Sequence, residues 1–187
     1  SYQRPPSYPT KVMYGVAYAI KILNDHGLVH REINPSHICL NSSSEPVIID
    51  FGISRPFKHT NGIINEMSYD VYMAPEVVGN PEPTPKADVY SLGMILIYLH
   101  DGSLTLNKTE PSAVPPKELF HQIKSKARVP DLPEPDVKNT NNDKFIELIK
   151  HCIEIDPQQR WSITDVINFL HQNDLAYPDT NIEECRA

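Results

Sequence analysis

The sequence predicts a mainly α-helical domain that carries a small β-hairpin. Apolar residues recur at helical spacing between Lys11 and His26, which is typical of an amphipathic helix. From Asp88 to Leu99 almost every residue is apolar, and a run of this length is too short to span a bilayer and predicts a buried helix. The apolar triplets at 38–40 and 47–49 flank a Ser-rich segment, a pattern typical of two strands joined by a turn.

The first helix is expected between an extended lead-in and a glycine. Residues 1–9 hold three prolines and predict the extended lead-in. Thr10 has the side chain of an N-cap, and Gly27 suits the left-handed position that follows a helix. His26 then lies at the C-terminal end of the helix, where its ring complements the helix dipole. Metal binding by His26 and His30 is not expected, because Gly27 breaks the helix between them.

Ionisable side chains lie at both ends of the predicted hairpin. Glu32 and His37 precede the first strand, and Asp50 directly follows the second. Because a hairpin brings its two ends together, we expect these three side chains to point into one cleft. A carboxylate after an apolar strand, at the start of the turn Asp50-Phe51-Gly52, is typical of a residue that holds a divalent metal at a phosphate. The sequence therefore predicts a metal and phosphate site beside the hairpin.

Proline-bearing segments separate the later helices. Residues 101–116 predict a polar loop, and residues 116–126 a short helix. A longer helix is predicted at 143–155. A capping box at 162–165 predicts the start of the last helix, and residues 173–187 form a polar tail.

The composition is that of one ordinary intracellular domain. The chain has 187 residues, of which 40% are hydrophobic, so that a core can be buried. The net charge of −7 argues against nucleic acid as a partner, and no apolar run approaches the ~20 residues of a membrane helix. Three scattered cysteines indicate the reducing cytoplasm, with the nucleus as the alternative, and Cys39 and Cys152 are expected in the core. The chain begins at Ser1 rather than at a methionine, so we expect a piece of a longer product.

Five short motifs follow one another along the chain. The segment from His30 to His37 follows the catalytic-loop pattern H-R-D-L-x-x-x-N, and Asp50-Phe51-Gly52 is the metal-binding D-F-G. The others, in chain order, are Ala74-Pro75-Glu76, Asp88 and Arg160. The chain therefore resembles the protein kinase family over roughly two-thirds of its length.

The resemblance implies a kinase C-terminal lobe at residues 10–172, with an activation segment at 50–76. In the family, an arginine at the position of Arg31 can pair with a phosphate on that segment. The aspartate at the position of Asp88 hydrogen-bonds the catalytic-loop backbone, although a plain N-cap is an alternative role. The residues that the resemblance assigns to the scaffold are His30, Arg31, Phe51, Gly52, Glu76, Asp88 and Arg160. No Gly-x-Gly-x-x-Gly occurs, so the N-terminal lobe is expected to be absent from this chain.

Four positions depart from the family pattern. Glu32 replaces the catalytic aspartate and is one methylene longer, and a displacement of about 1 Å can lower a rate on the order of 10²-fold. Asn34 replaces the lysine that neutralises the transferring phosphoryl group. His37 replaces the asparagine that holds the second metal, and a neutral imidazole is a softer ligand than Mg²⁺ prefers. Tyr69 replaces a threonine before Ala-Pro-Glu, and the adjacent Ser68 is the alternative residue for that role. Asp50 alone is retained among the metal and phosphate groups.

We therefore predict a pseudokinase lobe that acts as a protein-binding or allosteric module. Glu32 is the candidate catalytic residue, Asp50 the candidate metal ligand, and His37 a candidate cofactor contact beside Asp50. A protein partner is expected, whereas nucleic acid and a membrane are not. ATP and Mg²⁺ are expected only if an N-terminal lobe exists elsewhere in the product, and no cofactor is expected for this chain alone.

Two alternatives stay open. The chain is an active serine/threonine kinase if Glu32 serves as the base and the N-terminal lobe lies outside this chain. It is otherwise a truncated product with no settled function.

Overall fold

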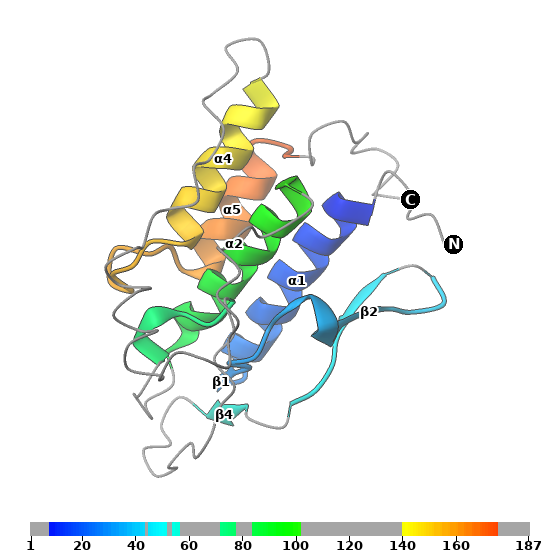
Figure 1. Ribbon diagram of the computed structural model, residues 1–187, viewed down its shortest axis with the longest axis vertical. Helices are drawn as coiled ribbons and strands as arrows, with labels where there is room; N and C mark the ends of the chain where they lie inside the picture. Colours follow the sequence, from blue (N-terminus) through cyan, green and yellow to red (C-terminus); the bar gives the residue numbers. More distant parts are fainter. Residues whose placement is uncertain are drawn as a thin grey trace, which may run out of the picture.

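The computed structural model describes residues 8–43, 45–51, 54–56, 72–77, 84–101 and 140–175. Four α-helices lie in these residues: α1 (Tyr8–Asp25), α2 (Pro85–Asp101), α4 (Thr140–Cys152) and α5 (Ile163–Gln172). Helix α2 packs against α1 on one side and α4 on the other, and α5 contacts both α1 and α4 (Figure 1). The mainly α-helical prediction is confirmed for the part of the chain that the structure describes.

Two small antiparallel sheets accompany the helices. Strand β2 (Ile38–Leu40) pairs with β3 (Pro46–Ile48), and this hairpin lies against α1. Strand β1 (Leu28–Val29) pairs with β4 (Arg55–Pro56). The predicted hairpin is confirmed, with its second strand beginning at Pro46, one residue earlier than expected.

Two short 3₁₀ turns complete the order of elements. Turn η1 (Pro35–His37) leads into β2, and turn η2 (Pro75–Val77) precedes α2.

Helix α1 begins earlier than the sequence predicts. Its first residue is Tyr8, so Thr10 lies inside the helix with a fully buried side chain, and the expectation of Thr10 as N-cap is wrong. The predicted end of the helix is confirmed, because Gly27 has a φ of 73° in the left-handed region. The ring of His26 lies at this end, with Nδ1 2.8 Å from the carbonyl oxygen of Ile22. Residues 1–7 of the expected lead-in lie outside the described residues.

Helix α2 is the buried helix that the apolar run predicts. Every residue from Ala87 to Ile97 is buried. The helix begins at Pro85, and Thr84 accepts a hydrogen bond from the Lys86 N–H at 3.4 Å. Asp88 is therefore the fourth residue of α2, and its alternative role as an N-cap is excluded.

The last two helices agree with the sequence apart from their ends. Helix α4 covers residues 140–152 rather than 143–155, and Cys152 is buried as expected. The capping box of α5 is confirmed, because Ser162 and Asp165 each accept a backbone N–H of the other. Leu175 lies within the expected polar tail but is fully buried, and its N–H donates to Leu170 at 3.0 Å.

Cys39 is exposed, so its expected place in the core is wrong. It is the middle residue of β2, and its Cα partner Val47 is also exposed. Successive side chains of a strand point to opposite faces, so Cys39 faces away from its half-buried neighbours Ile38 and Leu40.

Some predicted elements lie outside the described residues. These are residues 102–116 of the predicted loop, the helix at 116–126, residues 176–187 and the whole segment 57–71. Asp101, the first residue of the predicted loop, belongs to α2. None of the helices in the described ranges combines the length and the hydropathy that crossing a membrane requires.

Candidate functional site

Asp88 holds the segment that follows β1 against helix α2. Its carboxylate accepts the backbone N–H of His30 and that of Arg31, each at 2.8 Å. The carboxyl group is completely buried, and burial raises its pKa to about 6 against the opposing effect of the two N–H groups and the Arg31 charge. Arg31 itself has a φ of 75°, so the double hydrogen bond holds this segment in an uncommon backbone conformation.

His30 connects the same segment to the end of the hairpin. Its Nδ1 accepts the Glu32 N–H at 3.3 Å, so its Nε2–H donates to the carbonyl oxygen of Ile49 at 3.1 Å. Burial lowers the pKa of His30, which favours the neutral ring that this pattern requires. The ring of Phe51 contacts His30 edge to face, with centroids 4.8 Å apart. Residues 30 and 51 are therefore packed together.

Asn34 is occupied by hydrogen bonds within its own loop. Its side-chain oxygen accepts the N–H of Ser36 at 2.9 Å and the Ser36 hydroxyl at 2.5 Å. Its amide nitrogen lies 3.4 Å from the Glu32 carbonyl oxygen and 3.3 Å from Nδ1 of His37. Asn34 is 7% exposed and caps η1. It therefore stabilises the loop instead of presenting a polar group outward.

His37 and Asp50 face each other at the edge of the hairpin. Nδ1 of His37 lies 2.8 Å from the carbonyl oxygen of Glu32, and Nε2 lies 3.7 Å from Oδ2 of Asp50. Asp50 has a φ of 62°, a left-handed conformation that is uncommon for residues other than glycine and that aspartate adopts more readily than most. The structure thus brings two of the three predicted side chains together, and Glu32 joins them through its backbone carbonyl.

Glu32 also lines a small cavity on the side of the loop that faces α2. The other lining residues are Arg31, Ile33, Asn34, Tyr72, Met73 and Ser91. Among the described residues, no three His, Cys, Asp or Glu side chains lie close enough together to hold a metal ion. Gly52, the last residue of the predicted metal-binding turn, lies outside the described residues.

The donors at this edge do not fit the Mg²⁺ that the resemblance to protein kinases implies. Mg²⁺ requires oxygen ligands in nearly octahedral geometry. In the described part of the chain, the facing pair offers the carboxylate of Asp50 and the imidazole nitrogen of His37. One oxygen-bearing side chain and one nitrogen donor make a poor Mg²⁺ site, so no catalytic step is assigned to bound Mg²⁺ here.

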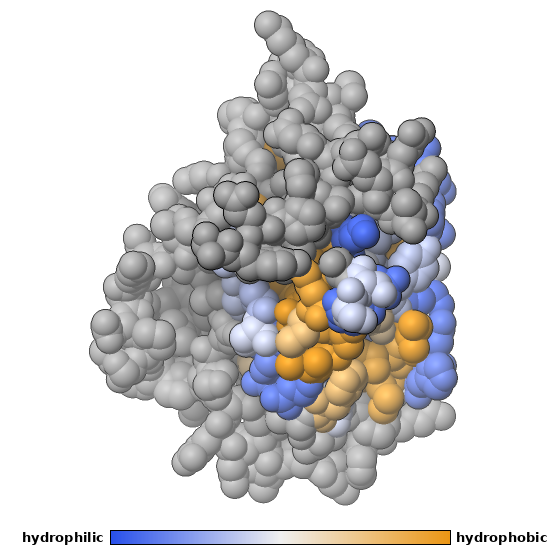
Figure 2. All heavy atoms as spheres, turned by 90° about the vertical axis from the view of Figure 1, so that its right-hand side faces the viewer, coloured by the Kyte–Doolittle hydropathy of each residue, from blue (hydrophilic) through white to orange (hydrophobic). Residues whose placement is uncertain are grey.

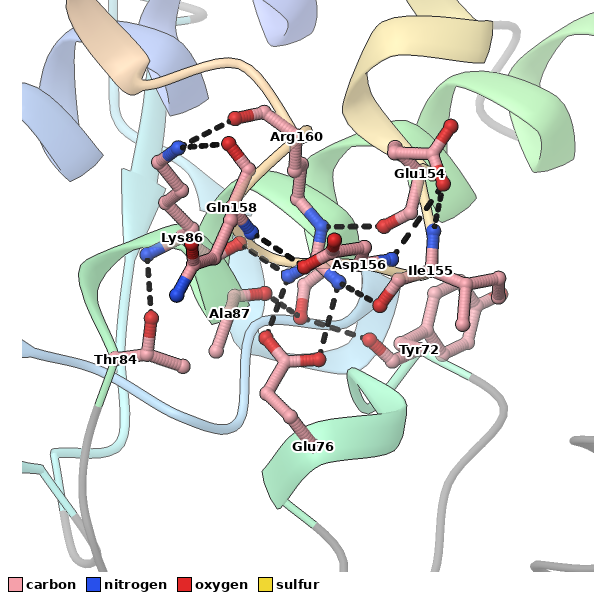
Figure 3. Close-up of polar contacts among 11 residues, drawn as sticks. Tyr72, Glu76, Thr84, Lys86, Ala87, Glu154, Ile155, Asp156, Gln158 and Arg160 are labelled. Atoms are coloured by element: carbon pink, nitrogen blue, oxygen red, sulfur yellow. Dashed lines mark hydrogen bonds and ion pairs between the residues drawn. The ribbon is translucent and has the colours of Figure 1, made fainter.

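A second cluster surrounds the guanidinium group of Arg160. The group binds both oxygens of Glu76, with Nη1 at 2.6 Å from Oε1 and Nη2 at 3.0 Å from Oε2 (Figure 3). The Arg160 side chain is fully buried and that of Glu76 is 15% exposed. Both residues belong to the scaffold that the resemblance to protein kinases implies. The pair joins η2 to the loop between α4 and α5.

Sequence reasoning missed two polar residues of this region. Nζ of Lys86 donates to the carbonyl oxygen of Arg160 at 2.7 Å, and the Ser91 hydroxyl donates to the carbonyl oxygen of Tyr72 at 2.7 Å. Both side chains come from α2 and bind backbone atoms of distant segments. No spacing or motif marks such contacts, because any carbonyl oxygen can accept them.

The buried Asp88, the loop that it holds and the Glu76–Arg160 pair define a kinase-like helical domain. The sequence profile of the protein kinase domain matches residues 5–171. The chain therefore belongs to the protein kinase family.

Individual relatives are similar over most of this chain. It is 29% identical over 160 residues to the serine/threonine-protein kinase pakE of Dictyostelium discoideum, covering 84% of this chain and 16% of pakE. It is 28% identical to mitogen-activated protein kinase kinase 2 of Arabidopsis thaliana, covering 95% of this chain and 49% of that protein. Identity to the serine/threonine-protein kinase STE20 of Candida glabrata is 29%, over 87% of this chain and 17% of that kinase. The chain thus spans half or less of the length of each of these relatives.

Proposed function

We propose that this chain is the C-terminal lobe of a kinase-like domain with impaired phosphoryl transfer, which acts as a protein-binding or allosteric module. Phosphoryl transfer depends mainly on positioning and on the neutralisation of charge. Glu32, Asn34 and His37 replace the three groups that would supply these effects. The scaffold contacts of Asp88 and Arg160 are retained beside them.

The main support for this proposal is that the substituted side chains Asn34 and His37 form hydrogen bonds within their own loop. Asn34 bonds Ser36 and lies within contact distance of Glu32 and His37. His37 is bonded to the Glu32 carbonyl oxygen. Neither side chain supplies the positive charge or the hard oxygen ligand that a transferring phosphoryl group and its Mg²⁺ require.

An exposed apolar surface supports the protein-binding role. Five large apolar side chains are at least 40% exposed: Tyr18, Ile22, Val47, Ile49 and Phe51. They come from α1 and from the hairpin and the residues just after it. Figure 2 shows hydrophobic atoms gathered on the face of the molecule that lies to the right in Figure 1. A surface of this kind is typical of contact with another protein or domain.

The catalytic part of the proposal is tested by thermal shift with Mg-ATP and by a phosphotransfer assay on the full-length protein. We expect no shift for this chain and no transfer. In full-length protein that carries Glu32→Asp, Asn34→Lys and His37→Asn together, transfer should rise, because the missing groups are restored. Glu45→Asp is the matched control, because Glu45 is an exposed glutamate of the hairpin turn. Robust transfer by the unchanged protein that disappears in Glu32→Ala would refute the proposal.

The binding part is tested by proximity labelling in cells with the unchanged chain and an Ile22→Gln, Val47→Thr double variant. We expect a defined set of labelled proteins to be lost in the variant. The set should persist in Asn168→Gln, which changes an exposed polar residue of α5. Identical labelling for all three proteins would contradict a role for the apolar surface.

The alternative function is an active serine/threonine kinase. It is supported by the serine/threonine kinases among the relatives and by the carboxylate that Glu32 retains. In that case the N-terminal lobe is supplied by sequence outside this chain, and Glu32→Ala abolishes the transfer that the unchanged full-length protein performs.

A further inference from the structure

We draw no further inference here: the strongest candidate, the exposed apolar surface that Tyr18 and Ile22 of α1 form with Val47, Ile49 and Phe51 of the hairpin and the residues just after it, carries none, because nothing in the structure shows what covers it.

Discussion

Arg160 joins three separate segments of the chain through one guanidinium group. Its shortest contact with Glu76 in η2 is 2.6 Å. It also donates to the carbonyl oxygen of Lys86 at the start of α2 and to that of Glu154 after α4, each at 2.8 Å. The group also lies 5.0 Å from the ring centre of Tyr90, in cation–π range. A fully buried arginine requires such partners, because an unpaired charge in the interior is strongly unfavourable.

Arg160→Ala should destabilise the protein by about 3–5 kcal/mol, because it leaves the carboxylate of Glu76 without its partner in a mostly buried place. Urea unfolding followed by circular dichroism measures the loss. Adding Glu76→Gln to this variant should recover part of the stability, since the uncompensated charge is then removed. Lys144→Ala is the control, because the Lys144–Glu147 pair is more than 40% exposed on both sides and such pairs contribute little. Equal losses for Arg160→Ala and Lys144→Ala would contradict the structural role of the buried pair.

Asp88 should make the stability depend on pH between about 4 and 6. Burial raises its pKa from 3.8 to about 6, so the folded protein favours the neutral carboxyl group. The stability that this preference contributes is complete below pH 3.8 and is lost as the pH rises through about 6. The difference in pKa corresponds to about 3 kcal/mol.

The measurement compares the free energy of unfolding of the unchanged chain with that of Asp88→Asn from pH 4 to pH 7.5. As the pH rises, the free energy of unfolding of the unchanged chain should fall relative to that of Asp88→Asn, because asparagine does not ionise. Burial lowers the pKa of His30, so its contribution to the stability of the protein falls as the pH falls. Because His30 is present in both proteins, this contribution largely cancels in the difference between them. Parallel pH profiles for the two proteins would show that Asp88 does not titrate differently on folding.

The β2–β3 hairpin packs closely against α1 at a glycine of the helix, Gly15. A Cβ added to Gly15 would lie 2.1 Å from Cγ of Pro46 and 3.0 Å from its Cδ. Pro46 is the first residue of β3, so this contact sets how closely the hairpin approaches the helix. Asp50 follows the second strand of the hairpin by two residues, so this packing also positions Asp50.

Gly15→Ala should therefore destabilise the protein by about 1–3 kcal/mol, although alanine favours a helix over glycine by about 0.5–1 kcal/mol. Pro46→Ala removes the two atoms that would clash most. The double variant Gly15→Ala, Pro46→Ala should accordingly be more stable than the sum of the two single changes predicts. Thermal unfolding of the four proteins gives this coupling energy. Simple additivity would mean that the helix and the hairpin are not in this close contact.

The sequence predicts the helices better than it predicts their ends. The buried helix α2 and the capping box of α5 follow directly from an unbroken apolar run and from Ser162 and Asp165. The predicted start of α1 at Lys11 is three residues late, because Thr10 has the chemistry of an N-cap and yet is buried within the helix. Burial depends on which segments pack nearby, and that information is not local.

The sequence predicts which residues belong to the candidate site, but it does not predict how their side chains are arranged. The motifs place Glu32, His37 and Asp50 near one hairpin. They do not reveal that His37 takes the backbone carbonyl of Glu32 as its partner, or that Asn34 is occupied within the loop. These hydrogen bonds depend on the exact path of the η1 turn, and single-residue patterns do not encode that path.

The apolar surface over α1 and the hairpin should make the isolated chain self-associate. Ile22 is 59% exposed, Phe51 50% and Val47 41%, and exposure of this kind in one region favours contact between molecules. Ile22→Gln should reduce concentration-dependent association in sedimentation velocity and lower the fluorescence of a bound apolar dye. The melting temperature should hardly change, because Ile22 contributes little to the core. Asn168→Gln introduces the same side chain at another exposed helical position and should leave association unchanged. If Ile22→Gln associates as strongly as the unchanged chain, Ile22 does not belong to the surface through which the molecules associate.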